Sequence, residues 1–149
     1  MKTISRFSKS LALVAPVMAM ATESTEAAAY IKFDGVDGEA KDSQFEGYLK
    51  VEFFKVEIDG ATEREGPVLK DLVISLPMEK SSPTLMLACA TGKILKNASL
   101  VLTKTTGEGE EAIFVKIELN NVIVSSYSSS GKANEVPTDE ITLGYTEVE

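Results

Sequence analysis

The feature that most constrains this chain of 149 residues is an apolar pattern that repeats at every second position. The longest example, at 113–120, has Ile113, Val115, Ile117 and Leu119 in one phase and Lys116, Glu118 and Asn120 in the other. Shorter alternations occupy residues 49–53, 72–76 and 141–145. Because successive side chains of a strand point to opposite faces of a sheet, this pattern predicts antiparallel strands with one buried face. The chain is therefore expected to be mainly β.

Changes of phase within these runs indicate bent strands. Apolar side chains keep one phase through 49–53 and the opposite phase through 54–58, and Asn120-Asn121 interrupts the long alternation. A bulge or strong bend accounts for such a change, and a closed barrel requires bends of this kind. The turn Gly107-Glu108-Gly109 predicts a hairpin into the long strand. We expect an antiparallel β-barrel.

One short helix is predicted to flank the barrel. Ser82 is placed to cap it, Pro83 suits its first position, and Gly92 is placed to end it. Leu85 and Cys89, four residues apart, would share its buried face. Cys89 is the only cysteine, so it cannot form an internal disulfide, and we interpret it as a small core residue rather than a nucleophile.

The composition argues against most catalytic mechanisms, metal sites and nucleic-acid binding. The sequence contains no histidine, which excludes Ser-His-Asp and Cys-His mechanisms and the commonest zinc sites. The 15 Lys and Arg against 23 Asp and Glu give a net charge of -8, which repels nucleic-acid phosphates. We therefore expect no enzyme, no cofactor, no metal site and no nucleic-acid partner.

Four local motifs resemble functional sites, but their residue types or spacing give little support for a function. The acids of 34–39 lack the spacing of a calcium loop, so a solvated turn is favoured. The serine run 125–130 before Lys132 is expected to be a polar loop. Asn97-Ala98-Ser99 is a formal glycosylation acceptor, meaningful only in a eukaryotic secretory host. Residues 63–66 are expected to form a charged, solvent-facing hairpin tip.

Residues 1–21 differ from the rest of the chain. They combine Lys2, Arg6 and Lys9 with an apolar run from Leu11 to Met18 and the triplet Ala19-Met20-Ala21. This pattern predicts a secretory signal peptide, and the apolar run is too short to span a bilayer. The alternative is an uncleaved N-terminal arm on a cytoplasmic protein. Residues 22–29 are expected to be a linker, and 30–149 the domain. The mature chain is expected to be secreted, without stable membrane insertion.

Several strings, in order, resemble the Hcp family, the tube proteins of bacterial type VI secretion systems. Residues 81–93 resemble its helix segment, 30–42 its opening strand and turn, 122–131 its long strand and serine-rich loop, and 141–145 a late strand. The residues that carry this match include Pro83, Leu85, Ala88, Gly92, Lys93, Ser125, Ser126 and Gly131. The resemblance covers roughly residues 29–146.

The resemblance implies a β-barrel with a flanking helix, homo-hexameric rings that stack into a hollow tube, effector proteins in the lumen, and no catalysis. Three features depart from the family. The family normally lacks a cleaved signal. The family's ring-stacking loop is usually longer than the segment here, which contains Asp59, Gly60, Glu63, Arg64 and Glu65. The family usually adds a strand beyond the position of Glu149, so we expect an unpaired sheet edge.

Two functions remain open at this point. The first is a structural subunit of an Hcp-like ring or tube. The second is a stand-alone secreted β-barrel that binds or carries another protein outside any contractile system. Only the first requires a large homo-oligomer, so the mass in solution separates them.

Overall fold

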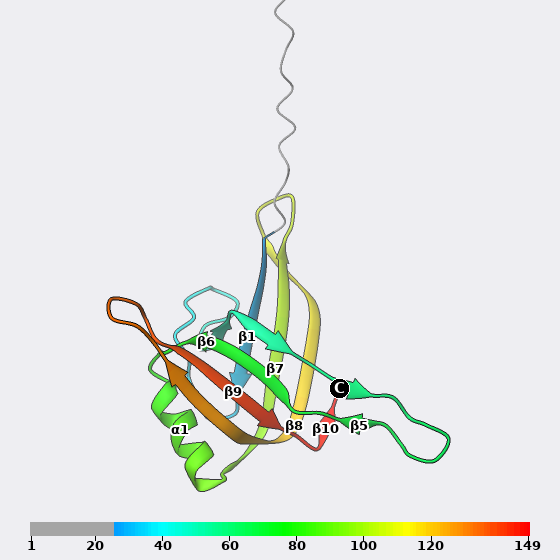
Figure 1. Cartoon of the computed structure of the whole chain (residues 1–149). Coiled ribbons are helices and arrows are strands. Elements are labelled where there is room, and N and C mark those ends of the chain that lie inside the picture. The colour runs from blue at the N-terminus through cyan, green and yellow to red at the C-terminus, as the bar shows by residue number, and fades with distance from the viewer. Residues whose placement is uncertain (1–25) are drawn as a thin grey trace, which may run out of the picture.

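Ten strands and one helix occupy residues 26–149, the part of the chain that the computed structural model describes (Figure 1). The helix is α1 (Ser82–Thr91). The strands are β1 (Ala27–Phe33), β2 (Leu49–Val51), β3 (Phe53–Lys55), β4 (Ile58–Asp59), β5 (Val68–Leu69), β6 (Leu72–Pro77), β7 (Ile94–Thr105), β8 (Glu111–Ser130), β9 (Thr138–Gly144) and β10 (Glu147–Val148). The prediction of a mainly β fold with one short helix is confirmed.

The strands form an eight-stranded antiparallel sheet in the order β2-β1-β7-β8-β9-β6-β3, with β10 also paired to β8. Strand β8 is 20 residues long and joins the two halves of this sheet, because β7 pairs with one of its edges and β9 with the other. The predicted turn at 107–109 connects β7 to β8, with the Gly109 N–H donating to Thr106 O. Strands β4 and β5 form a separate two-stranded sheet.

The two ends of the sheet come together at Glu52, which shows that the sheet is curled. Strands β2 and β3 lie at the two ends of the sheet order, yet only Glu52 separates them in the chain. Its backbone N–H donates to Ser75 O at 2.8 Å. The predicted bend is therefore present, but it falls before Phe53, which is 54% exposed instead of sharing the buried face of Leu49 and Val51. In residues 26–149 no ladder joins β2 to β6, so the barrel does not close completely.

Apolar side chains fill the inside of the curled sheet. The largest fully buried ones come from all parts of the sheet and from α1, and include Phe33, Leu49, Leu72, Ile74, Leu85, Leu100, Leu119, Ile141 and Leu143. A smaller cluster of Tyr30, Phe45 and Val101 lies apart from this core, with the rings of Tyr30 and Phe45 stacked at 4.5 Å. Each fully buried aliphatic or aromatic side chain contributes about 1.5–3 kcal/mol, so the core stabilises the curvature.

Helix α1 starts one residue earlier than the sequence suggests. Ser81 is the N-cap residue, Ser82 is the first helical residue, and Gly92 ends the helix with a φ of 64°. The Ser82 hydroxyl does not cap the helix, because it bonds to Asp139 on β9. Leu85 and Ala88 are buried. Cys89, predicted to share the buried face with Leu85, is only partly buried and packs against the core.

The structure differs from the sequence-based expectation at the boundaries of two strands, β1 and β8. Residues 27–29, expected within a linker, belong to β1 because they pair with Leu102, Thr103 and Lys104 of β7. The serine run 125–130, expected as a loop, is the end of β8, because its pairing with β9 outweighs the weak strand preference of serine.

The predicted signal peptide lies outside the described residues. None of the helices within residues 26–149 has the length and apolar character needed to cross a bilayer.

The first part of strand β8 has one unpaired edge. Along 111–117 it has β7 on one side and no strand on the other within the described part of the chain. The register shifts between Leu102 and Thr103, which makes Phe114 an extra residue and moves Ile113 out of phase. Ile113, predicted on a buried face, is consequently 51% exposed. The start of β8 projects beyond the core.

Candidate functional site

The segment expected to contact other rings forms a two-stranded hairpin arm, residues 57–70, that projects from the barrel (Figure 1). Strands β4 and β5 form its base, and the Lys70 N–H donates to Glu57 O at 3.1 Å. At its tip, the Thr62 N–H donates to Glu65 O at 2.7 Å, and Thr62 Oγ1 accepts from the Glu65 N–H. The sequence-predicted residues all lie here: Asp59 is in β4, and Gly60, Glu63, Arg64 and Glu65 are in the tip.

The hairpin arm combines charge with exposed apolar surface. Lys70 Nζ lies 3.1 Å from Asp59 Oδ2, and this contact raises the pKa of Lys70 above its ordinary value. Lys55 Nζ lies 2.8 Å from Glu57 Oε2 and lowers the pKa of Glu57. Ile58 and Val68 are each about half exposed. A β-ribbon with bare edges and unburied apolar side chains is suited to docking against another protein.

The family-motif residues of α1 have structural roles. Pro83 lies in its first turn, and Leu85 and Ala88 face the core. The Gly92 N–H and the Lys93 N–H both reach Ala88 O, so these two residues complete the C-terminal cap. The Lys93 side chain is exposed. This part of the motif fixes the helix against the sheet.

The remaining motif residues shape the end of β8. Ser125 Oγ lies 3.0 Å from Asp71 Oδ2 and 3.1 Å from the Thr142 carbonyl O. It lies at a register shift between Val124 and Ser126, and Ser126 resumes the pairing with β9. A Cβ at Gly131 would approach Pro137 to 3.1 Å, so glycine fits this close passage best. Within residues 26–149, no hydrogen bond joins the Lys132 side chain to these serines, and the Ser125 hydroxyl is held by Asp71 and Thr142 instead.

A buried polar cluster that the sequence analysis missed lies between α1, β8 and β9. Asp139 is completely buried, and its Oδ2 accepts hydrogen bonds from Ser82 Oγ and the Tyr127 hydroxyl. Burial, and then the bond to Asp139, raise the pKa of Tyr127 to about 12. The alternation of Ile141 and Leu143 could have placed Asp139 on the inward face. Its two partners could not be found from sequence spacing.

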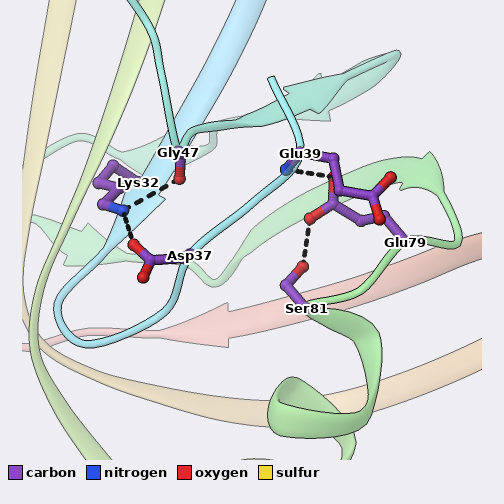
Figure 2. Close-up of polar contacts among 6 residues, drawn as sticks. All are labelled: Lys32, Asp37, Glu39, Gly47, Glu79 and Ser81. Carbon is purple, nitrogen blue, oxygen red and sulfur yellow. Dashed lines mark hydrogen bonds and ion pairs between the residues drawn. The ribbon is translucent and has the colours of Figure 1, made fainter. Parts of the chain in front are cut away.

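The acidic turn considered for calcium is held by the protein's own groups (Figure 2). Lys32 Nζ lies 2.6 Å from Asp37 Oδ1 and 3.0 Å from Gly47 O. The hydrogen bond and charge of Lys32 lower the pKa of Asp37. A Cβ at Gly38 would lie 2.2 Å from Tyr48 O, so only glycine fits there. The turn is structural, and residues 26–149 contain no group of three or more acids or cysteines placed to hold a metal.

The same loop is fastened to the start of α1. The Glu39 N–H donates to Glu79 Oε2 at 3.2 Å, and the Lys80 N–H donates to Glu39 Oε1 at 3.0 Å. Ser81 Oγ donates to the other carboxylate oxygen of Glu79 (Figure 2). These bonds join the β1–β2 loop to the β6–α1 connection. They stabilise the fold by fixing the loop against the start of the helix.

Comparison with known proteins identifies the family. Residues 30–149 match the sequence profile of the family described as "Type VI secretion system effector, Hcp". This chain belongs to the Hcp family. The match covers α1, the hairpin arm and the curled sheet except for the first three residues of β1, and it confirms the resemblance seen in the sequence.

Individual Hcp relatives agree with this assignment. Protein hcp1 of Pseudomonas aeruginosa is 35% identical over 82 residues, which are 54% of this chain and 50% of that protein. The alignment thus spans half the length of this curated relative. A type VI secretion system effector from Yersinia pestis has a TM-score of 0.70 at 25% identity, over 80% of this chain and 85% of that one. Hcp1 from Salmonella typhimurium, at 24% identity, shares the fold with a TM-score of 0.72 over 82% of both chains.

Proposed function

We propose that this chain is a structural, non-enzymatic subunit of a type VI secretion tube, in which six copies close a ring and rings stack. The family match across residues 30–149 is the observation that carries this proposal. The resemblance of the strings at 30–42, 81–93 and 122–131 to the Hcp family supports the same role.

The surface of the domain is suited to self-association. The hairpin arm exposes Ile58 and Val68, and the start of β8 exposes Ile113 and Phe114 beside an unpaired edge. Exposed edges and apolar groups favour pairing with another chain. In the proposed tube, the hairpin arm and the start of β8 both lie at boundaries between subunits.

The proposed subunit carries effector proteins in the lumen of the tube and needs no cofactor. The sequence has no histidine to serve as a general base near neutral pH. Its net charge of -8 disfavours nucleic acid as cargo. Residues 1–21 act as a secretory signal, so the mature protein starts at Thr22 and is found outside the cytoplasm.

Electron microscopy of the purified protein tests this function. The proposal expects ring-shaped particles with six-fold symmetry and a central opening. Featureless monomers at every concentration would contradict it and would favour the stand-alone secreted binding module.

A further inference from the structure

The two ends of strand β7 have opposite chemistry. Near its end at Thr105, an open groove of 890 Å³ lies between β1, the bend at Glu52 and the start of β8. Near its beginning at Ile94, basic and apolar side chains are exposed next to the end of α1. Twelve residues of β7 separate the two places, about 40 Å along a strand. Figure 1 shows the β7–β8 turn and α1 at opposite ends of these strands.

The groove is apolar with an acidic rim, and we call it the acidic groove. Its apolar wall includes Phe54, Leu102 and Phe114, of which Phe114 is 51% exposed. Four carboxylate residues, Glu26, Asp42, Glu52 and Glu111, line it together with a single lysine, Lys50. Lys104 lies nearby, over the ring of Phe114. Acids still outnumber bases around the groove.

Two of these carboxylates are free to meet a cation. The side chains of Glu26 and Glu52 are exposed and make no hydrogen bond or ion pair with other residues of 26–149. In contrast, Asp42 accepts from the Tyr30 hydroxyl and Glu111 accepts from Thr103 Oγ1. Reversal of charge at Glu26 and Glu52 therefore breaks no side-chain hydrogen bond or ion pair within residues 26–149.

The opposite end, which we call the basic end, consists of Lys93, Ile94, Lys96 and Ile123. Ile94 pairs directly with Ile123 across β7 and β8, and the two side chains are 60% and 38% exposed. Lys96 lies two residues after Ile94 and so shares its face of the sheet. Neither Lys93 nor Lys96 has a carboxylate within 4.0 Å among the described residues.

We propose that the basic end of one copy docks into the acidic groove of the next, so that copies associate end to end along the direction of β7. Lysines then face the free carboxylates of Glu26 and Glu52, and Ile94 and Ile123 cover the apolar wall at Phe114. This contact is heterologous, since two different surfaces meet, and such contacts continue into open columns. The inference rests on the proposed function, because it names the contact between successive copies in a tube.

Charge reversal on either surface tests the contact in the full-length protein. The variant Lys93→Glu/Lys96→Glu makes the basic end acidic, and Glu26→Lys/Glu52→Lys makes the groove basic. In either variant alone, the two docking surfaces carry charges of the same sign and repel each other. Columns should then form only at a protein concentration at least about tenfold higher. A mixture of the two should form columns again, because each acidic surface meets a basic one. Sedimentation velocity and electron microscopy measure column length, and thermal melting checks folding.

A matched control separates this contact from net charge. Lys41→Glu/Lys132→Glu changes the net charge as much as the basic-end variant, at exposed lysines elsewhere. It should form columns like the unchanged protein. Columns from either single variant at the ordinary concentration, no recovery in the mixture, or equal loss in the control would each overturn the inference. If the unchanged protein forms rings without columns, this inference and the stacking of rings both fail, while the closed ring of the proposed function stands. If it is monomeric, the proposed function fails as well.

Discussion

Ser82 and Asp139, 57 positions apart in the chain, are joined by a hydrogen bond of 2.6 Å between Oγ and Oδ2. The bond links the first residue of α1 to β9, and both residues are buried. The same carboxylate oxygen accepts the hydroxyl of Tyr127 on β8. Burying a carboxylate without hydrogen bonds is costly, and these two donors offset part of that cost at Oδ2, whereas Oδ1 is buried with no hydrogen-bond partner among residues 26–149.

Ser82→Ala should lower the free energy of unfolding by about 1–3 kcal/mol, because it removes one donor from a buried carboxylate. Ser125→Ala is the matched control, since its hydroxyl also lies near a carboxylate, that of Asp71, but is exposed. The control should change stability by no more than about 0.5 kcal/mol. Urea unfolding measures both. Equal effects of the two variants would show that the buried hydrogen bond stabilises the protein no more than the exposed one.

Tyr127 makes the free energy of unfolding depend on pH in the alkaline range. Its pKa in the folded protein is raised from an ordinary 10.0 to about 12, so the folded state favours the neutral phenol. The resulting stability is complete below pH 10 and is lost as the pH rises through 12. Unfolding free energies measured across this window should fall more steeply for the unchanged protein than for Tyr127→Phe. Parallel curves would rule out this contribution.

Leu85→Asp should prevent folding, because Leu85 is completely buried and an unpaired carboxylate there has no donor. Loss of the leucine alone costs about 2–5 kcal/mol. Leu87→Asp, two residues along the same helix, provides the control because Leu87 is 64% exposed. Circular dichroism and thermal melting should show a folded control and an unfolded Leu85→Asp. Normal melting of Leu85→Asp would mean that α1 is not packed as described.

The sequence predicts the parts of the fold that local patterns determine. Alternation at 72–76 and 141–145 predicts β6 and β9, and Pro83 with Gly92 predicts α1 within one residue. The phase change after Phe53 predicts a bend close to the one that the structure has at Glu52. These features depend on side-chain periodicity and turn geometry, which act over a few residues.

Long-range pairing explains what the sequence could not predict. The serine run of β8 was expected as a loop because serine favours loops, but its backbone bonds are satisfied by β9. Ile113 was expected to be buried, and the register shift at Leu102 overrides its alternation. The contacts of Ser82 and Tyr127 with Asp139 join three separate elements. Each outcome depends on a partner far along the chain, which spacing alone does not reveal.

Reversal of charge at the tip of the hairpin arm should affect assembly without affecting folding. Glu63→Lys/Glu65→Lys alters side chains that are exposed, so the melting temperature should stay within a few degrees. If the arm contacts the next ring, stacking should weaken. Glu135→Lys/Glu140→Lys makes the same change of charge at other exposed positions and should stack normally. Unaltered stacking of the arm variant would exclude the tip from this contact.

The intact mass of the protein from its native host tests the predicted signal peptide. The pattern of residues 1–21 predicts a mature N-terminus at Thr22, after Ala19-Met20-Ala21. A secreted form should therefore lack the first 21 residues. Recovery of protein that begins at Met1 would contradict the signal peptide and favour the uncleaved arm.

Multi-angle light scattering of the purified protein tests the central claim most directly, since it reports the number of copies per particle. A ring subunit should elute as a discrete species with about six times the mass of the chain, 16.0 kDa before processing. This mass should persist on dilution if the ring is closed. A mass of one chain at every concentration would contradict the account.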